Sequence, residues 1–476
     1  MGGLCALVFA AVGMRFLIGV MPPEKLASMP YLQGLGLHPL TIVFTCSLSL
    51  LAGIVFAVIP AVRTSLSSVI DGLKEGARGS AGTTWRRLGS NLVIFEVALA
   101  MVLMVGAGLL GKSLYLLLHL DTGFSPDHLA VVQTAWPPAS YAKDQQKTVL
   151  AGQMMDRIRG LPGVQSVGIS LAPPIDSGWG TASFHVAGRP NHGEENDVLQ
   201  RQVSSGYFTT LQARLMRGRH FSEDEDASKP LVAIVNRTLA NKYFSGEDPI
   251  GKQIYYDWKP KELMQIVGVV DDIKEGPLEG TPLPALYVPY NQNPCPWPAV
   301  LIRSSRTEGS LFPEITQAIH AVDPFISVSG QQTMTERINR SPAAYLHESS
   351  ALLVGLFAAV ALLLSVVGLY GVVAYSVSQR THEIGIRMAL GAERGAVYRL
   401  IMTEAGRLTV AGVLLGLICS FGAATLLRSL LFGVRSWDVP TLAVVAIVLG
   451  LSALLASYLP ARRAAAVNPV DALHTE

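Results

Sequence analysis

The sequence contains one stretch whose residue types and spacing could hold a nucleotide phosphate. Residues 106–113 read GAGLLGKS, a full match to the pattern G-x-x-x-x-G-K-[ST]. Such a run binds phosphate when it joins a strand to a helix and its backbone amides are free to donate. Here it lies inside the apolar run 91–118, where a membrane helix would use the same amides in its own hydrogen bonds. We therefore predict no nucleotide site, and we expect Lys112 to lie at the outer membrane interface and reach toward the headgroups.

A second stretch has the pattern of a metal-binding ATPase strand. IVGVVDD at 266–272 is an apolar strand pattern that ends in two acidic residues, but it is predicted to lie outside the cell. The sequence has no LSGGQ-like signature, no pair of histidines at helical spacing and no G-x-S-x-G elbow. We identify no catalytic residue, no cofactor and no metal ligand, so the chain is not expected to be an enzyme. Glu96 lies near the inner end of a predicted span, where a carboxylate can mark a transport path or reach the headgroups.

The composition is that of a membrane protein. Of the 476 residues, 50% are hydrophobic and only 15% are charged, with a mean hydropathy of +0.38, whereas soluble domains are about 25% charged. A net charge of +2 excludes a strongly basic nucleic-acid binder. Cys5, Cys46 and Cys419 lie in apolar runs and Cys295 stands alone, so neither a disulfide framework nor a cysteine metal site is expected.

The apolar runs predict about six transmembrane helices, because about 20 apolar residues are enough to cross a bilayer. With the N-terminus in the cytoplasm, the inner segments hold eleven Lys and Arg residues and the short outer loops hold two. The positive-inside rule then puts both termini in the cytoplasm and residues 120–347 outside the membrane. The predicted spans are 2–20, 40–62, 88–118, 349–379, 408–427 and 439–461.

The long segment 120–347 has the pattern of an α/β domain. Two strand-helix-strand halves flank an insertion at about 180–290, which suits a ferredoxin-like lobe that is split by a second lobe. An unrelated α/β arrangement is the alternative. The predicted elements are a strand at 130–134, a helix at 144–160, a turn into a strand at 161–170, a helix at 311–321 and a turn into a strand at 322–328.

An internal repeat relates two exits from the membrane. Residues 60–75 align without gaps to residues 460–475 at an offset of 400, with five identical positions among sixteen. In each copy an apolar run ends in Pro-Ala, an arginine and a short amphipathic tail. The shared context favours a duplication over a chance match. Residues 2–62 would then be the last two spans of a truncated first copy.

Three parts of the sequence carry a family resemblance. They are QRTHEIGIRMALGAERGAVYRLIMTEA at 379–405, LPARRAAAVNPVDALHTE at 459–476, and the outer stretches between 203 and 292 that include GEDPIGK and QIVGVVDDIKEGPLEG. Together they resemble the MacB/FtsX-type permeases of ABC transporters, and most closely the subgroup with two fused permease units. This chain resembles the C-terminal part of that subgroup.

The resemblance implies a domain organisation and a location. The fold class is a multi-pass α-helical membrane protein with a large α/β extracytoplasmic MacB-like core domain, in the inner membrane of a bacterial cell. The implied parts are two spans of a truncated first unit at 1–62, a cytoplasmic linker at 63–91, a span at 92–118, the core domain at 119–347 and an FtsX-like domain at 348–476. The last of these contains a cytoplasmic coupling segment at 379–403.

The resemblance also implies a mechanism and partners. A partner ATPase of the ABC type would push on the coupling segment and thereby move the outer domain, and a second permease unit and membrane lipid would surround the spans. A membrane-anchored sensor or scaffold with a ligand-binding outer domain is the alternative. We expect the ATPase to contact a short helix that presents Ile384 and Met388. The implied coupling residues are Glu383, Ile384, Gly385, Ile386, Arg387, Met388, Ala389, Leu390, Gly391 and Ala392.

Overall fold

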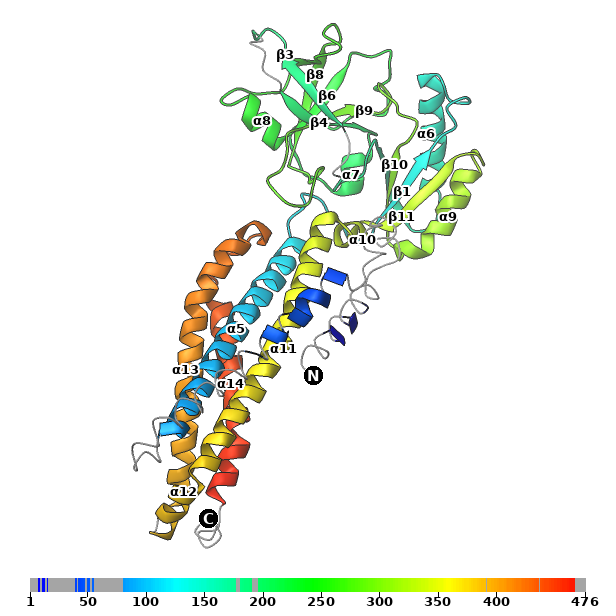
Figure 1. Ribbon diagram of the computed structural model, residues 1–476. Coiled ribbons are helices and arrows are strands. Elements are labelled where there is room, and N and C mark those ends of the chain that lie inside the picture. The colour runs from blue at the N-terminus through cyan, green and yellow to red at the C-terminus, as the bar shows by residue number, and fades with distance from the viewer. Residues whose placement is uncertain are drawn as a thin grey trace. The chain divides into compact units, whose positions relative to one another are not determined.

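The computed structural model describes residues 80–176, 180–190, 196–390, 392–435 and 437–466, together with short helical stretches between residues 7 and 54. The chain divides into two compact units, Met1–Leu88 and Gly89–Glu476. Apart from the first turns of α5 (Ser80–Leu118), the elements discussed below belong to the second unit. In that unit α5 leads into a domain of eleven described strands, and the remaining long helices follow it (Figure 1).

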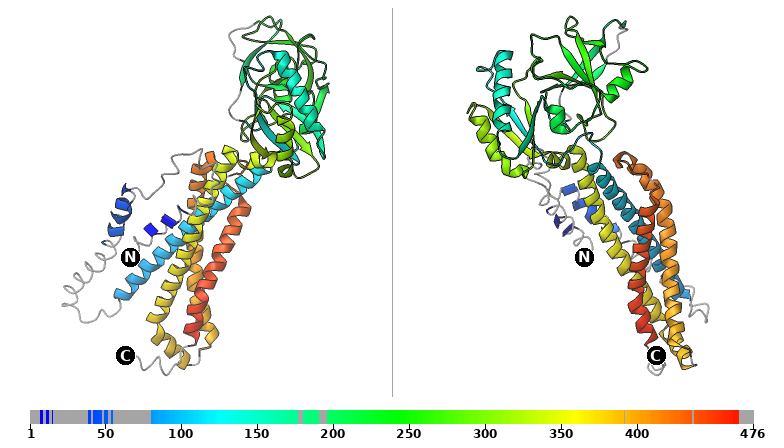
Figure 2. Two further views of the ribbon diagram at one scale, coloured as in Figure 1. Left: turned by 90° about the vertical axis from the view of Figure 1, so that its right-hand side faces the viewer. Right: turned by 180° about the vertical axis from the view of Figure 1, so that it is seen from behind.

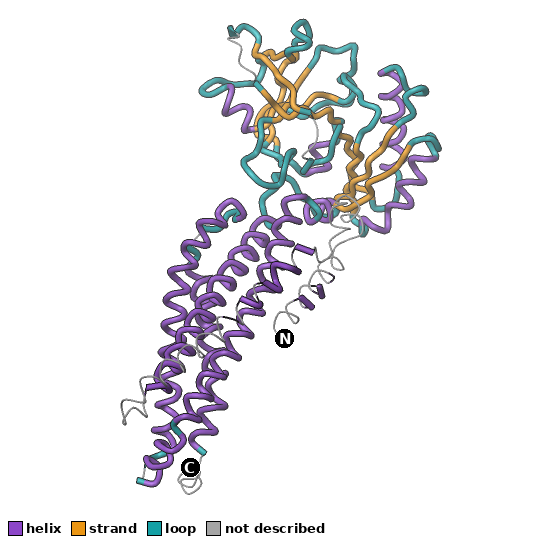
Figure 3. Tube along the Cα trace, in the orientation of Figure 1, coloured by secondary structure: helices purple, strands orange, loops and turns teal. Residues whose placement is uncertain are grey.

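The first lobe of the domain is built from the two ends of its sequence. Its strands have the order β11-β1-β10-β2 with antiparallel neighbours, the order of a split ferredoxin-like lobe. Helices α6 and α9 cover this sheet (Figure 3). Met154 of α6 and Ile315 of α9 are fully buried in the cluster between the helices and the sheet. The elements are β1 (Leu129–Ala135), α6 (Asp144–Arg159), β2 (Val164–Ser170), β10 (Ala299–Ser304), α9 (Glu308–His320) and β11 (Ser327–Thr333).

The second lobe comes from the insertion and contains a closed ring of six strands. Hydrogen-bonded neighbours run β4-β3-β7-β8-β6-β9, and β9 pairs with β4 to close the ring. Ring closure leaves these strands without a free edge along that path. The bounds are β3 (Thr181–Val186), β4 (Asp197–Val203), α7 (Tyr207–Leu211), β5 (Leu215–Gly218), β6 (Val232–Asn236), α8 (Arg237–Tyr243), β7 (Gln253–Tyr256), β8 (Met264–Val270) and β9 (Ala285–Pro289).

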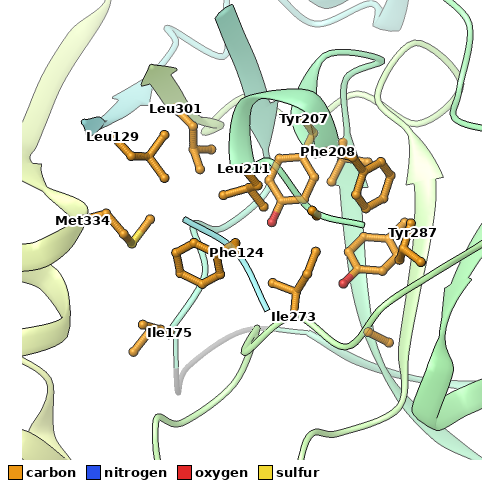
Figure 4. Packing of buried hydrophobic residues seen from close by; sticks show 14 of the residues in the cluster. Phe124, Leu129, Ile175, Tyr207, Phe208, Leu211, Ile273, Tyr287, Leu301 and Met334 are labelled. Atoms are coloured by element: carbon orange, nitrogen blue, oxygen red, sulfur yellow. The ribbon is translucent and has the colours of Figure 1, made fainter. Parts of the chain in front are cut away.

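A single apolar cluster joins the two lobes. Tyr207 and Phe208 of α7 pack against Tyr287 of β9, and Phe208 and Tyr287 meet edge to face with ring centroids 5.0 Å apart (Figure 4). The same cluster includes Leu117 at the end of α5 and Ala344 at the start of α11, both buried. The core of the domain is therefore continuous with the ends of two long helices.

Four long apolar helices form a bundle in which small residues allow close contact. Added Cβ atoms at Gly412 and Gly416 of α13 would each lie 2.6 Å from side chains of α5, namely Val97 and Met101. The G-x-x-x-G spacing therefore serves helix packing. α13 contacts α14, and α11 contacts both (Figure 2). The bounds are α10 (Met334–Asn339), α11 (Pro342–Gln379), α12 (Thr381–Ala389), α13 (Arg394–Leu426), η1 (Leu427–Leu430) and α14 (Val439–Ala465).

Four helices in the described part of the chain are long and apolar enough to cross a membrane. They are Gly89–Leu118, Pro342–Gln379, Arg394–Leu426 and Val439–Ala465. The sequence predicted about six spans, and the additional two, 2–20 and 40–62, lie largely outside the described residues. Of the two repeated segments, 60–75 and 460–475, the first and residues 467–475 of the second lie outside them as well.

Candidate coupling site and domain junction

The predicted coupling residues lie on a short helix between two spans. α12 starts directly after α11 and ends at Ala389, so it lies at the end of α11 opposite to the large domain. α11 has 38 residues and is therefore about 57 Å long. α12 is thus joined to the domain by a single continuous helix.

One face of α12 is anchored in the bundle. Ile384 is only 5% exposed and belongs to a cluster with Val373 of α11 and Ile401 of α13. Gly385 is buried, and Met388 packs against the same cluster. The expectation that Ile384 and Met388 face a partner is therefore wrong for Ile384, because the short helix turns this residue toward the apolar interior of its own bundle.

The opposite face of α12 is open. Ile386 is 41% exposed and Leu390 is 83% exposed, and Ala389 is also exposed. Between them Arg387 donates to Glu383 one turn earlier, with both side chains about half exposed. An apolar pair beside two opposite charges is a surface suited to a protein partner.

The end of the coupling segment is a tight turn. The backbone amide of Ala392 donates to the carbonyl of Arg387 over 2.9 Å, and the helix has already ended at Leu390. Gly391, the predicted helix stop, lies outside the described residues. The predicted residues that the structure describes in α12 are thus divided between a buried face and an exposed face of one short helix.

A polar clamp holds α12 between its two neighbours. Arg380, at the junction of α11 and α12, donates to Glu404 of α13 over 3.3 Å, and Ser376 donates to the other oxygen of Glu404. These side chains line a small groove that also contains Ile384 and Leu408. Because the clamp bridges both spans, a force on α12 acts on α11 and α13 together.

The P-loop-like motif is helical, as predicted. Residues 106–113 lie in α5, where their backbone amides are part of the helix. Lys112 donates to Asp438, which also caps the N-terminus of α14 by accepting from the amide of Thr441. The hydrogen bond from Lys112 lowers the pKa of Asp438 below its usual value. Lys112 therefore fastens α5 to α14 and takes no part in a phosphate loop.

The acidic end of the strand at 266–272 is neutralised by an arginine. Arg237 of α8 pairs with Asp271 over 3.0 Å and with Asp272 over 3.1 Å. Within the described residues no group of three His, Cys, Asp or Glu side chains is arranged to hold a metal ion. The two aspartates are therefore structural partners of Arg237.

Residues 271–280, here named the hub segment, connect several parts of the domain. The amide of Lys274 donates to the carbonyl of Thr122 in the loop that follows α5. Glu275 is fully buried and accepts from Arg201 of β4 over 3.2 Å and from the hydroxyl of Tyr207 over 2.9 Å. Burial raises the pKa of Glu275, and the charge of Arg201 opposes this shift. The hub segment is thus fixed to both lobes.

The hub segment also reaches the bundle through one histidine. Glu279 and the Nε2 atom of His347, in the second turn of α11, form a short contact. The Nδ1 atom of His347 lies 3.3 Å from the hydroxyl of Ser113 in α5, and this hydroxyl accepts from the amide of Phe432 before α14. His347 is only 4% exposed. A polar chain therefore links the domain with two of the long helices, α5 and α11, and with the loop that precedes α14.

Glu96 lies against the neighbouring span. Its Oε2 atom is buried and has no hydrogen-bond partner within the described residues. It touches the helix α11 at Gly368, where an added Cβ would collide with it. The absence of a side chain at Gly368 makes room for this carboxylate.

Sequence reasoning did not predict the junction at His347 or the clamp between Arg380 and Glu404. His347 directly precedes the uncharged run 349–379, and a polar residue at such a boundary is ordinary at a membrane interface. Glu279 belongs to a stretch that already carried the family resemblance. Only the folded chain brings Glu279, Ser113 and His347 together, because they are separated by 68 and 234 positions.

Comparison with known families assigns both halves of the second unit. The family of MacB-like periplasmic core domains matches residues 91–327, and the FtsX-like permease C-terminal family matches residues 355–469. These two ranges contain the hub segment and the coupling residues, respectively.

Several curated proteins are similar in sequence. The macrolide export ATP-binding/permease protein MacB of Marinobacter nauticus is 29% identical over 277 residues, which cover 55% of this chain and 41% of that protein. The uncharacterized ABC transporter permease YknZ of Bacillus subtilis is 25% identical over 335 residues, which cover 67% and 78%. The pyoverdine export ATP-binding/permease protein PvdT of Pseudomonas savastanoi pv. phaseolicola is 30% identical over 283 residues, which cover 55% and 40%. The chain thus spans about two fifths of the MacB and PvdT relatives.

A solved structure also resembles part of the chain. The periplasmic region of MacB from Actinobacillus actinomycetemcomitans matches with a TM-score of 0.31 and 14% identity, and it covers 46% of this chain and 95% of that one.

Proposed function

Because the chain belongs to the family of ABC transporter permeases with a MacB-like periplasmic core domain and an FtsX-like C-terminal region, we propose that it is a non-catalytic membrane subunit. It transmits ATP-driven motion from a partner ATPase to its extracytoplasmic domain, for export or release of a substrate. The observation that carries the proposal is the exposed face of α12, formed by Ile386 and Leu390 beside the pair of Glu383 and Arg387.

The proposed path of the motion follows α11. The ATPase grips the exposed face of α12, and the clamp between Arg380 and Glu404 passes the force to the spans. At the other end of α11, His347 passes it to Glu279 and so to the hub segment. The path runs along the helices and needs no polar pore through the bundle.

The proposed arrangement in the cell follows the distribution of basic residues. Both termini lie in the cytoplasm of a bacterial cell, the protein is in the inner membrane, and the large domain is extracytoplasmic. The proposed parts are the last two spans of a first unit at 1–62, a linker at 63–91, a span at 92–118, the core domain at 119–347 and the FtsX-like domain at 348–476.

Cysteine labelling tests this orientation. Ser222, Ser305 and Ser378 are all exposed in the structure, so cysteines at these positions are reachable by water-soluble reagents. Cys295 is buried, and burial raises the pKa of its thiol to about 11, so it should react slowly; the exposed Cys46 and Cys419 are replaced by serine in every variant. In sealed cells a membrane-impermeant maleimide should modify Ser222→Cys and Ser305→Cys but spare Ser378→Cys. Labelling of Ser378→Cys from outside would reverse the orientation.

Three kinds of partner are proposed. An ABC-type ATP-binding subunit supplies ATP hydrolysis, since the motif at 106–113 of this chain is helical. The similar MacB and PvdT proteins are named as ATP-binding/permease proteins, so their names include both functions. A second permease unit and membrane lipid cover the spans, which expose large apolar side chains such as Leu363 and Leu455, 65% and 75% exposed. No nucleic-acid partner is expected.

A co-purification experiment separates this proposal from a sensor or scaffold. The full chain is expressed with the candidate ABC ATPase from the neighbouring reading frame and is isolated in nanodiscs, with and without ATP. A transporter subunit should retain the ATPase, and the association should respond to nucleotide. The alternative, a sensor or scaffold, predicts that the chain is isolated without the ATPase under both conditions.

A further inference from the structure

The closed strand ring of the second lobe has a cavity at one mouth. It opens where β4, β7 and β9 end and where β6 and β8 begin, and its volume is about 280 Å³. This is close to the lower limit of about 300 Å³ for small-molecule pockets, which often occur in the mouths of β-barrels. The lining includes Gln200, Gln202, Tyr256, Trp258, Met264 and Val288.

The strands put polar side chains where the ring should be apolar. Along β4, Val198 lies in the apolar interior of the ring, and the alternation of strand side chains turns Gln200 and Gln202 toward the same interior. On β9, Val288 also faces this interior. Replacement of inward apolar positions by amides at one mouth breaks the pattern of a packed core, and such departures occur at functional sites.

One polar atom at this mouth lacks a partner. The Oε1 atom of Gln202 is buried and has no hydrogen-bond partner within the described residues, whereas the hydroxyl of Tyr256 interacts with the side chain of Gln200. Tyr256 is only 5% exposed. A buried polar group without a partner costs about 1–3 kcal/mol. The Oε1 atom of Gln202 therefore gains a partner if the amide turns toward a molecule in the cavity.

The rim of the cavity contains an exposed tryptophan, and its two charged residues form a pair without net charge. Trp258 stacks on Tyr256 with ring centroids 4.6 Å apart and planes only 5° apart, yet Trp258 is 54% exposed. Lys259 and Glu262, the charged residues of the lining, pair with each other over 2.9 Å. A flat exposed indole beside neutral amides suits a ring with apolar C–H faces and hydroxyl groups at its edge. No free strand edge lines the described ring to bind an extended peptide.

We propose that this cavity, the barrel-mouth site, binds a neutral sugar ring. The ring stacks on the face of Trp258 that Tyr256 leaves open, and one of its hydroxyls donates to Oε1 of Gln202, whose amide turns toward the cavity. The proposal rests on the second lobe alone, so it does not depend on the partner ATPase. It gives the extracytoplasmic domain a ligand of its own, such as a free sugar or the sugar of a larger molecule.

Saturation-transfer difference NMR on the full chain in nanodiscs tests the site. The probes are glucose, N-acetylglucosamine, cellobiose and chitobiose, with trialanine as a peptide probe. At least one sugar should receive saturation, strongest on its ring C–H protons. Trp258→Ala and Gln202→Leu should each weaken its binding about tenfold or more. Trp297→Ala, which removes an exposed tryptophan that does not line the cavity, should bind as the unmodified chain does.

Thermal unfolding distinguishes a binding residue from a structural one. Gln202→Leu removes an acceptor that has no partner, so the unfolding temperature of its ligand-free form should not fall. A clear fall together with unchanged sugar binding would mean that Gln202 only supports the fold. The site is refuted if none of the four sugars binds at about 10 mM, a concentration that detects even weak complexes. It is also refuted if sugar binding survives both substitutions, or if trialanine alone binds.

Discussion

The two ends of α11 are fastened in different ways. At the end next to α12, the contacts are mainly apolar, with Ile384 inserted among Val373 and Ile401, and the clamp between Arg380 and Glu404 is partly exposed. At the end next to the domain, His347 is almost fully buried and is held by directional polar contacts with Glu279 and Ser113.

This difference indicates what each end can tolerate. Apolar contacts are non-directional, so α12 can rock on the bundle while it stays attached. Hydrogen bonds require a narrow range of distance and angle, and a buried polar group that loses its partner is costly. The contacts of His347 at the domain end should therefore stay intact while α12 moves at the other end. Motion of α12 would then be transmitted along α11 to the hub segment.

The largest effect is expected from breaking α12 itself. Ile386→Pro removes a backbone donor and clashes with the preceding turn, which costs about 3 kcal/mol or more in helix stability. The variant should insert into the membrane and keep its outer domain, because position 386 lies outside the spans and the domain. It should lose recruitment of the ATPase or transport, measured by pull-down and a transport assay.

Two aspartate substitutions compare the exposed face of α12 with its buried face. Ile386→Asp changes an exposed side chain and should reduce ATPase binding while the chain remains stable. Ile384→Asp puts a charge into the apolar cluster and should lower the unfolding temperature in nanodiscs. Undiminished binding and transport in both Ile386 variants would show that the coupling residues were assigned wrongly.

The next largest effect concerns the buried junction. Glu279→Ala leaves the Nε2 atom of His347 without its partner, and His347→Ala removes both contacts, each at a cost of about 1–3 kcal/mol. Both variants should still bind the ATPase and hydrolyse ATP, yet transport per ATP should fall. His119→Ala, which changes an exposed histidine near the end of α5, is the control and should transport normally. Equal loss of transport and ATPase activity would mean general damage.

Sequence reasoning predicted many of the helices and strands but missed several of the contacts at the two ends of α11. Strand and helix periodicity predicted the elements around 130–170, and uncharged runs predicted spans such as 349–379. It did not predict the burial of Ile384, because α12 is too short for its pattern to reveal which face meets the bundle. The contact between Glu279 and His347 and the closure of the ring by β4 and β9 depend on pairing between distant segments, for which local patterns carry no signal.

A smaller effect is expected from charge reversal on α12. Arg387→Glu breaks an exposed pair whose own contribution to helix stability is about 0.3–0.5 kcal/mol. The fold should therefore be unaffected, while a partner contact at this surface would lose affinity severalfold. The double variant Glu383→Arg with Arg387→Glu restores the pair inside the helix. If it also restores ATPase binding, the pair acts by stabilising α12; if binding stays weak, Arg387 contacts the partner directly.

The smallest effect is expected at the motif that most resembles a nucleotide site. Lys112→Ala removes a pair with Asp438 in which the lysine is 40% exposed, so its loss should cost no more than about 1 kcal/mol. ATP turnover by the complex with its ATPase should stay essentially unchanged, since the amides of 106–113 are used by α5. The unfolding temperature should fall slightly, and Asp438→Asn should lower it similarly. Loss of ATP binding with normal assembly would overturn the helical reading of this motif and give the permease a catalytic site of its own.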